Sequence, residues 1–287
     1  MTSQPSSTRS APVSTKRNIV LLGIPLDANS SHMFGCAAGP AAIRAALHSG
    51  SGNGATENGL EVVERLDDQD DLPVSNIKGS TGDADQITNA INEYLDAGRR
   101  VLSLGGDHSI TFPILRAFGA HFTDLTVVHI DAHPDLYDDL DGNPLSHASP
   151  FARAMEQGCM ARLIQLGVRT ANSHQRIQAK RFGVEMYSPR ELDQFDSGSI
   201  AGPIYVSIDL DGLDPSVAPG VSHHEPGGLT FREVLDIIDA LPGPIVGADI
   251  VELNPTRDVV DMTSMVGAKL LKELAGAMLQ GPGVSTA

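Results

Sequence analysis

The sequence contains no tryptophan, only two cysteines and no apolar run of membrane-spanning length. Cys36 and Cys159 are too few for a disulfide framework, so we expect two free thiols in a reducing compartment. Basic residues are also scarce, because 20 Lys and Arg stand against 36 Asp and Glu, giving a formal net charge of −16. Nucleic-acid binding, which needs basic patches, is therefore not expected. No stretch approaches the roughly 18–20 apolar residues of a membrane span, so we expect a soluble protein without a membrane partner.

The remaining composition suits one large folded unit. Of the 287 residues, 41% are hydrophobic, which is enough for a substantial core. We expect a disordered N-terminal tail at 1–17 and a single domain at 18–287. The tail is rich in Ser, Thr and Pro and lacks acidic residues, a composition that organellar transit peptides share. It has no convincing apolar face, so a disordered tail is favoured and the expected location is the cytoplasm.

From residue 18 onward, short apolar runs alternate with segments of helical periodicity. The runs predict buried strands at 18–26, 99–106, 125–133, 161–169, 204–214 and 244–254. The periodic segments predict helices at 39–50, 83–98, 109–119, 146–158, 230–241 and 264–279. This alternation indicates an α/β fold with a parallel sheet that helices cover on both faces.

Charged side chains follow four of the predicted strands, at the edge where parallel sheets bind ligands. They are Asp107 and His108, then Asp131, His133 and Asp135, then Asp209, Asp211 and Asp214, and finally Glu252. Residues two apart in a strand point to the same face. The Asp131–His133 pair and the Asp209–Asp211 pair can therefore face one common site.

Together with His108 and Asp135, these pairs would form a cluster of four carboxylates and two imidazoles. Such a cluster would repel itself or take up protons unless cations neutralise it. Two divalent cations would balance the four carboxylates. A site rich in carboxylates and poor in imidazoles favours Mn²⁺ over Zn²⁺.

Each segment also has a simpler interpretation when it is read alone. A single Asp after a strand is usually a helix cap or a turn former, and the segment around Asp214 alone suggests a turn. His129 is interpreted as a core histidine. Asp138, Asp139 and Asp141 are interpreted as a solvated acidic loop. Capping alone does not explain why three separate strand ends carry acids or imidazoles at ligand spacing.

The segments GGDHS (105–109), DAHPD (131–135), SIDLDGLDP (207–215) and VELNP (251–255) resemble the signature segments of the ureohydrolase family, which includes arginase and agmatinase. Their order and separations are also similar, and the resemblance extends over about residues 18–277. The sequence of the segments 143–158, 180–185 and 218–229 is most similar to plant-type arginases and their bacterial relatives.

The resemblance implies an arginase-like, three-layer α/β/α fold around a mostly parallel β-sheet, with two Mn²⁺ ions per subunit. Ni²⁺ or Co²⁺ could substitute for Mn²⁺. The resemblance also implies a homo-oligomer, either a trimer or a hexamer. It assigns one ion to His108, Asp131, Asp135 and Asp209, and the other to His133, Asp131, Asp209 and Asp211.

The resemblance further implies hydrolysis of a small cationic guanidino substrate to urea and an amine. Glu252 would bind the planar guanidinium through two hydrogen bonds, and His147 would move a proton. Asp135 is expected to be catalytic as well as a ligand. The expected substrate contacts are Glu252, His147, Asn143, Ser146 and His223, with His224 a weaker candidate.

L-Arginine is the favoured substrate, with ornithine and urea as products. Tyr137 stands where animal arginases have an Asn, and the next two residues, Asp138 and Asp139, would repel a substrate carboxylate if they faced it. Agmatine is therefore an alternative substrate, as is another guanidino or amidino compound. A catalytically silent relative is disfavoured because His108, His133, His147 and Glu252 are intact. A zinc deacetylase is disfavoured because a second His–Asp pair is present.

Overall fold

The computed structural model describes residues 19–280. The predicted disordered tail at 1–17 lies outside the described residues, and the single domain expected at 18–287 remains a prediction. Within the described range, no helix is long and apolar enough to cross a bilayer.

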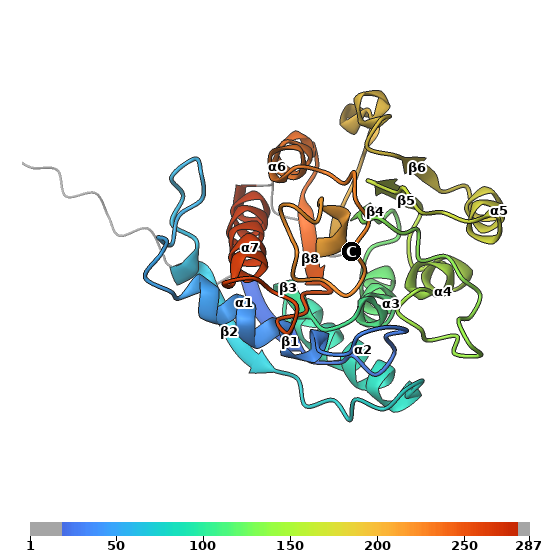
Figure 1. Cartoon of the computed structure of the whole chain (residues 1–287), viewed down its shortest axis with the longest axis horizontal. Helices are drawn as coiled ribbons and strands as arrows, with labels where there is room; N and C mark the ends of the chain where they lie inside the picture. Colours follow the sequence, from blue (N-terminus) through green and yellow to red (C-terminus); the bar gives the residue numbers. More distant parts are fainter. Residues whose placement is uncertain (1–18, 281–287) are drawn as a thin grey trace, which may run out of the picture.

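An eight-stranded, all-parallel sheet forms the centre of the molecule, with strand order β2-β1-β3-β8-β7-β4-β5-β6 (Figure 1). The strands are β1 (Ile19–Ile24), β2 (Leu66–Asp71), β3 (Arg100–Gly105), β4 (Thr126–Ile130), β5 (Arg162–Leu166), β6 (Glu185–Tyr187), β7 (Ile204–Asp209) and β8 (Ile245–Val251). The central strands are buried along their whole length, as expected when helices cover both faces of a sheet.

Two layers of helices enclose this sheet. The helices are α1 (Gly39–Leu47), α2 (Thr81–Asp96), α3 (Thr111–His121), α4 (Pro150–Glu156), α5 (Ser173–Phe182), α6 (Phe231–Ala240) and α7 (Met262–Gln280). Helices α1, α6 and α7 pack on one face, and α2, α3, α4 and α5 pack on the other (Figure 1). The predicted α/β class with a parallel sheet between two helical layers is confirmed.

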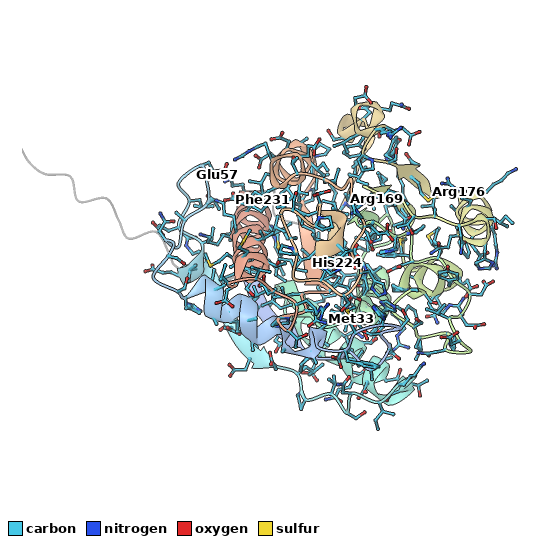
Figure 2. The ribbon with its side chains drawn as sticks, viewed as in Figure 1. Met33, Glu57, Arg169, Arg176, His224 and Phe231 are labelled. Atoms are coloured by element: carbon cyan, nitrogen blue, oxygen red, sulfur yellow. The ribbon has the colours of Figure 1, made fainter. Side chains whose placement is uncertain are left out.

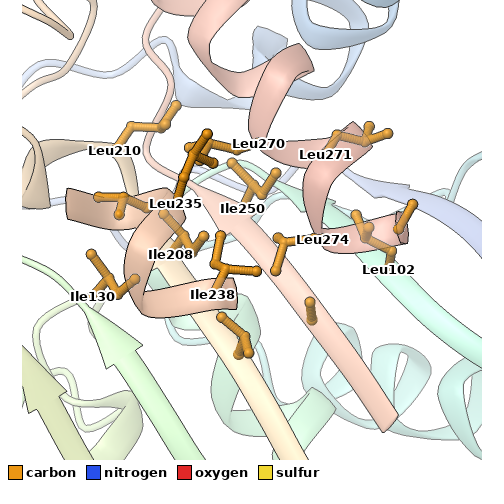
Figure 3. Close-up of a cluster of buried hydrophobic side chains, with 14 of the residues drawn as sticks. Leu102, Ile130, Ile208, Leu210, Leu235, Ile238, Ile250, Leu270, Leu271 and Leu274 are labelled. Atoms are coloured by element: carbon orange, nitrogen blue, oxygen red, sulfur yellow. The ribbon is translucent and has the colours of Figure 1, made fainter. Parts of the chain in front are cut away.

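Each face of the sheet has its own apolar core. On the α6 and α7 side, Ile208 and Ile250 of the sheet meet Leu235, Ile238 and Leu274 of the helices, all nearly or fully buried (Figure 3). On the opposite side, residues of α2, α3 and α4 pack against the other faces of the same strands. These two cores hold the strand ends in fixed positions, so the side chains that follow β3, β4, β7 and β8 have a rigid base.

Gly247 in β8 provides a test of how tightly the second core is packed. A Cβ atom at this position would lie 2.2 Å from Cζ of Phe118 in α3 and 3.1 Å from Cδ2 of Tyr205 in β7. Substitution Gly247→Ala should therefore lower the free energy of unfolding by about 1–3 kcal/mol, the usual cost of overpacking a core. Denaturant unfolding of metal-free protein would measure this loss.

Gly82→Ala is the matched control, because a Cβ there would come no closer than 3.6 Å to Oγ of Ser80. Gly82 lies in the first turn of α2, where alanine is the better helix former, so this variant should be neutral or slightly more stable. Equal stability of the two variants would show that the space around Gly247 is less restricted than the distances indicate.

Candidate metal centre and substrate cavity

The sheet order brings the four predicted segments together. Strands β3, β8, β7 and β4 are neighbours, and their carboxyl ends lie at one edge of the sheet. His108 opens a short 3-10 turn after β3, and Asp131, His133 and Asp135 follow β4. Asp209 ends β7, Asp211 lies in the next turn, and Glu252 follows β8.

Three carboxylates surround a single nitrogen of His108. Its Nδ1 lies 3.2 Å from Oδ2 of Asp131, 3.1 Å from Oδ2 of Asp135 and 3.2 Å from Oδ2 of Asp209. Despite these neighbours, Nδ1 is buried and forms no hydrogen bond of acceptable geometry within the described part of the chain. Oxygens of three carboxylates thus gather around one imidazole nitrogen, a set of donor atoms that could hold an ion.

A second donor group adjoins the first. Nδ1 of His133 lies 3.3 Å from Oδ1 of Asp131 and 3.1 Å from Oδ2 of Asp211. Asp131, His133 and Asp211 also form one of the groups whose donor atoms are close enough together to hold a metal ion. Because Asp131 gives Oδ2 to the first group and Oδ1 to the second, its carboxylate lies between the two.

The burial of these acids shows why cations fit here. Asp131, Asp209 and Asp211 are at most 4% exposed. Burial raises the pKa of Asp209 far above its usual value, and the charges of Asp211 and Asp131 add to the effect. Burial lowers the pKa of His108, but Asp131, Asp135 and Asp209 outweigh it and raise that pKa well above normal. Without a cation the cluster must therefore hold protons, so its oxygen-rich donor set suits divalent metal ions.

His129 holds the central carboxylate in place. Its Nε2 lies 2.8 Å from Oδ2 of Asp131, and its Nδ1 lies 3.0 Å from Nε2 of Gln165. The Gln165 amide also donates to the carbonyl of Pro134, so it acts as a donor toward His129, which leaves Nε2 of His129 as the donor to Asp131. The sequence indicated only a core histidine. The structure shows it buried but engaged with a member of the donor cluster.

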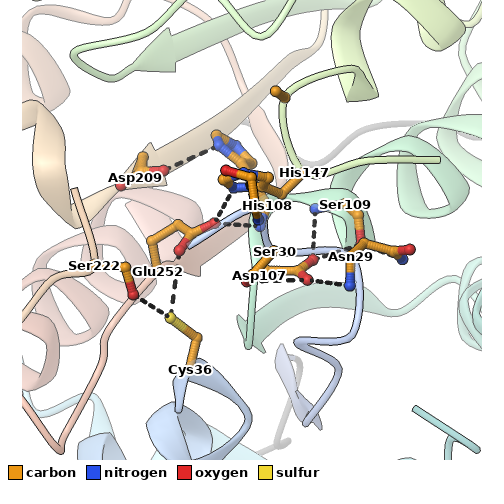
Figure 4. Close-up of polar contacts among 12 residues, drawn as sticks. Asn29, Ser30, Cys36, Asp107, His108, Ser109, His147, Asp209, Ser222 and Glu252 are labelled. Carbon is orange, nitrogen blue, oxygen red and sulfur yellow. Dashed lines mark hydrogen bonds and ion pairs between the residues drawn. The ribbon is translucent and has the colours of Figure 1, made fainter. Parts of the chain in front are cut away.

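Glu252 lies beside the donor cluster and connects several segments (Figure 4). Its Oε1 accepts hydrogen bonds from the backbone N–H of His108 and from Nδ1 of His147, both at 3.0 Å, and its Oε2 lies 3.3 Å from Sγ of Cys36. Burial raises its pKa, but the hydrogen bond and charge of His147 outweigh burial and lower the pKa of Glu252 to about 2. Glu252 is therefore an ionised carboxylate inside the protein.

Two site acids have left-handed backbone conformations. The φ angles are 50° for Asp135 and 64° for Glu252, a region that side-chain-bearing residues seldom adopt. Such a conformation costs about 1–3 kcal/mol and persists where the surrounding structure enforces it, often at functional sites. The strain at these two positions thus supports a functional interpretation.

His147 has partners for both of its protonation states. Its Nε2 lies 3.2 Å from the backbone N of Ser31 and 2.9 Å from Oγ of Ser31. A neutral Nε2 can accept from the backbone N–H, and a protonated Nε2 can donate to the hydroxyl. Burial lowers the pKa of His147, but the hydrogen bond and charge of Glu252 raise it to about 9.

A cavity of about 180 Å³ opens onto the cluster. Its lining includes seven of the predicted site residues: His133, Asp135, His147, Asp209, Asp211, His223 and Glu252. Six lining residues were not predicted as site residues: Ser31, Tyr137, Leu140, Ala148, Thr170 and Gln175. The fully buried His108 and Asp131 lie beneath this lining.

The ring of His223 lies close to a histidine of the donor cluster and to His147. Its ring centroid is 5.8 Å from that of His133, 5.3 Å from that of His147 and 5.7 Å from that of His32. Burial lowers its pKa, so this ring tends toward the neutral form. The neighbouring His224 instead contacts the carbonyl of Pro219 at 2.8 Å and is not part of the cavity lining.

Asn143 and Ser146 lie next to the cavity without lining it. Nδ2 of Asn143 donates to Oδ1 of Asn29, and its own Oδ1 accepts from the backbone of Leu145. Oγ of Ser146 accepts from the backbone N–H of Ala148. In this structure both side chains thus stabilise the loop, and their predicted contact with substrate remains untested.

The remaining predicted polar groups form caps and turns. Asp107 accepts from the backbone of Ser109, and Asp214 accepts from the backbone of Ser216 and Gly227. Arg169, which the sequence did not indicate, donates to the carbonyls of Asp211 and Gly212 and so fixes the turn that carries Asp211. In the view of Figure 2, Arg169 and the solvent-exposed His224 project toward the centre, and Arg176 of α5 projects toward the right edge.

Comparison with known proteins identifies the family to which this chain belongs. Residues 17–276 match the model of the arginase family, so the chain belongs to that family. The resemblance to ureohydrolases and the expected enzyme class are confirmed. "Arginase 1, mitochondrial" of Arabidopsis thaliana is 48% identical over 276 residues, covering 91% of this chain and 81% of the relative.

Two further relatives agree. "Arginase 2, chloroplastic/mitochondrial" of Arabidopsis thaliana is 45% identical over 279 residues, covering 92% of this chain and 81% of the relative. The solved structure of arginase from Medicago truncatula superposes with a TM-score of 0.85 at 44% identity, covering 91% of this chain and 87% of that one. These similarities confirm the predicted closeness to plant arginases and the arginase-like fold.

The predicted cytoplasmic location is wrong. The plant relatives at 45–48% identity are named as mitochondrial or chloroplastic proteins. The prediction depended on residues 1–17, whose Ser-, Thr- and Pro-rich composition without acids is common to disordered tails and organellar transit peptides. Composition alone does not separate these two, so it could not support a cytoplasmic location.

Proposed function

We propose that this protein hydrolyses L-arginine to L-ornithine and urea at a two-metal centre, with Mn²⁺ as the metal and Ni²⁺ or Co²⁺ as substitutes. The observation that carries this proposal is the cavity that combines two adjoining donor groups with a buried, ionised Glu252 and His147. The 45–48% identity to plant arginases supports arginine as the substrate.

The residues divide between two ions that share carboxylates. His108, Asp131, Asp135 and Asp209 would hold one, and His133, Asp131, Asp209 and Asp211 would hold the other. When bound, two such cations supply a nucleophilic oxygen near neutral pH. Burial lowers the pKa of His108 and raises that of Asp209, and nearby carboxylates raise the pKa values of both, so positive charge is stabilised at this position.

Glu252 would bind and orient the guanidinium. A carboxylate can accept two parallel hydrogen bonds from this planar cation, which fixes its plane as well as its position. The backbone N–H of His108 already occupies one side of Oε1, so the carboxylate cannot rotate freely. Because the site is buried, the attraction between Glu252 and the guanidinium would be strong, and it would hold the guanidinium carbon beside the donor cluster.

His147 would supply the proton that the leaving amine needs. It contacts Glu252 through Nδ1 and Ser31 through Nε2, so it would lie next to a guanidinium bound by Glu252. Ser31 offers a partner to Nε2 with or without its proton. His147 can therefore lose a proton to the amine without leaving a buried nitrogen unpaired.

The cavity also suits a substrate that carries a carboxylate. Four uncharged side chains able to donate hydrogen bonds line it: Ser31, Tyr137, Thr170 and Gln175. Gln175 is 3% exposed, and its Nε2 forms no hydrogen bond with another described residue. Asp138, which could have repelled a carboxylate, instead accepts from Nε2 of Gln178, and neither it nor Asp139 lines the cavity.

Urea release from arginine and from agmatine, measured side by side on Mn²⁺-loaded protein, tests the substrate. Agmatine lacks the carboxylate, so the donors in the cavity would lose their partner and kcat/KM should be at least about 100-fold lower than for arginine. Equal or faster turnover of agmatine would instead identify an agmatinase. Inactivity on both would leave another guanidino or amidino substrate, or a silent relative.

A homo-oligomer, either a trimer or a hexamer, forms part of the proposal. This part rests on membership of the arginase family, because single exposed apolar side chains such as Phe34 and Val260 are normal on a protein surface. Light scattering coupled to size-exclusion chromatography would give the mass, and a monomer would contradict this part alone.

A further inference from the structure

A buried carboxylate that binds neither metal nor substrate lies behind the first donor group. Asp249 is fully buried in the middle of β8, and Ser207 of β7 is its direct neighbour in the sheet register. Oγ of Ser207 lies 2.6 Å from Oδ1 of Asp249 and 3.0 Å from Nε2 of His108. Ser207 thus connects Asp249 to the ring nitrogen of His108 that faces away from the donor cluster.

The hydrogen bonds of Asp249 fix where the protons lie. Its Oδ2 accepts from the hydroxyl of Tyr205 at 2.7 Å and from Oγ1 of Thr111 at 3.0 Å. Burial raises the pKa of Asp249, but three hydroxyl groups converge on its two oxygens, and this arrangement stabilises the ionised form. An ionised carboxylate only accepts, so the single hydroxyl proton of Ser207 points to Oδ1. Oγ of Ser207 can then only accept from His108, and Nε2 of His108 must carry a proton.

This proton position determines the state of Nδ1, the other ring nitrogen of His108. With the proton fixed on Nε2, the neutral ring has a lone pair at Nδ1, the nitrogen around which oxygens of Asp131, Asp135 and Asp209 gather. We propose that Asp249, acting through Ser207, is a positioning residue that fixes the tautomer of His108 and so makes Nδ1 a metal ligand. This inference rests on the proposed two-metal function, and it assigns Asp249 a role in binding one ion of the two.

Substitution Asp249→Asn would reverse the direction of the two hydrogen bonds that connect Asp249 to His108 through Ser207, which we call the relay. The amide nitrogen of the introduced asparagine can donate to Oγ of Ser207, which then turns its own proton toward Nε2 of His108. Nε2 must accept, so the proton moves to Nδ1 and occupies the place of the ion. Loss of such supporting groups typically weakens metal binding about 10–100-fold.

The experiment is a Mn²⁺ titration of chelator-treated protein, followed by the EPR signal of free Mn²⁺. Thr111→Val is the matched control, because it removes a hydrogen bond from the same carboxylate on the oxygen that does not face Ser207. We expect wild type and the Thr111 variant to bind two ions with similar affinity. The Asp249 variant should bind one ion normally and the other about 10–100-fold more weakly.

Two results would overturn the inference. One is normal binding of both ions by the Asp249 variant, and the other is an equal loss in the Asp249 and Thr111 variants, which would indicate general disruption of the core. If Asp249→Asn does not fold, as judged by circular dichroism, Ser207→Ala replaces it. That variant should also bind one of its ions more weakly, and wild-type binding of both ions would show that no relay operates. Failure of wild type itself to bind two ions would instead refute the proposed function.

Discussion

Substitution Asp131→Ala is expected to abolish urea formation and to remove both metal ions. Asp131 directs Oδ2 at the donor group of His108 and Oδ1 at that of His133, so one change removes a ligand from each. It also removes the partner of Nε2 of His129 and leaves that buried ring unpaired. We expect activity to fall below detection, with less than one ion per subunit after dialysis, measured by elemental analysis.

Asp214→Ala is the matched control for this prediction. Asp214 belongs to the same acidic segment as Asp209 and Asp211, but it accepts hydrogen bonds from the backbone of a turn and does not line the cavity. The hydroxyl of Ser216 and these backbone groups lower the pKa of Asp214, so their loss should reduce stability at pH values above the pKa of an unfolded Asp, while both ions remain bound. Normal turnover by the Asp131 variant would refute the proposed metal assignment.

The fold was predictable where burial imposes an apolar pattern. The six central strands are apolar runs, and α3 was predicted despite Pro113, which stands in the first turn, where no intrahelical donor is needed. The missed elements carry no such pattern. Strand β2 has the sequence LDDQDD at an exposed sheet edge, β6 has three residues, and α5 is mainly polar, so their formation depends on neighbours.

The candidate site was predictable where the topology determines it. The carboxyl ends of neighbouring parallel strands meet at one edge, so acids and imidazoles at those ends had to come together. His129 was interpreted as core because its neighbours in β4 are apolar, and spacing alone does not reveal its contact with Asp131. Ser31 and Thr170 reach the cavity from irregular loops, where no periodicity tells which way a side chain points.

The loop at 136–149 also shows that sequence does not reveal which side chains of a loop reach the cavity. Asn143 and Ser146 were predicted as substrate contacts because they could donate hydrogen bonds to a substrate carboxylate. In the structure their side chains hold the loop together, and Tyr137 and Leu140 of the same loop line the cavity. Only the path of the chain decides which residues of such a loop face inward.

The second large effect is expected for Glu252→Gln, which should destroy turnover without removing metal. Glutamine keeps the size of the side chain but lacks the charge that pairs with the guanidinium. Removing one partner of a buried ion pair costs about 3–5 kcal/mol, which corresponds to a loss in kcat/KM of about 10²–10⁴-fold. Glu252 belongs to neither donor group, so elemental analysis should still find two ions per subunit.

The contrast with Asp131→Ala makes this result informative. Both residues are buried acids at the same edge of the sheet, but one lies between the donor groups and the other lines the cavity. Glu252→Asp, which keeps the charge and shortens the side chain, should recover part of the activity if charge is what matters. Metal loss in the Glu252→Gln variant would show that Glu252 is needed for the metal centre, and turnover within tenfold of wild type would show that it does not bind the guanidinium.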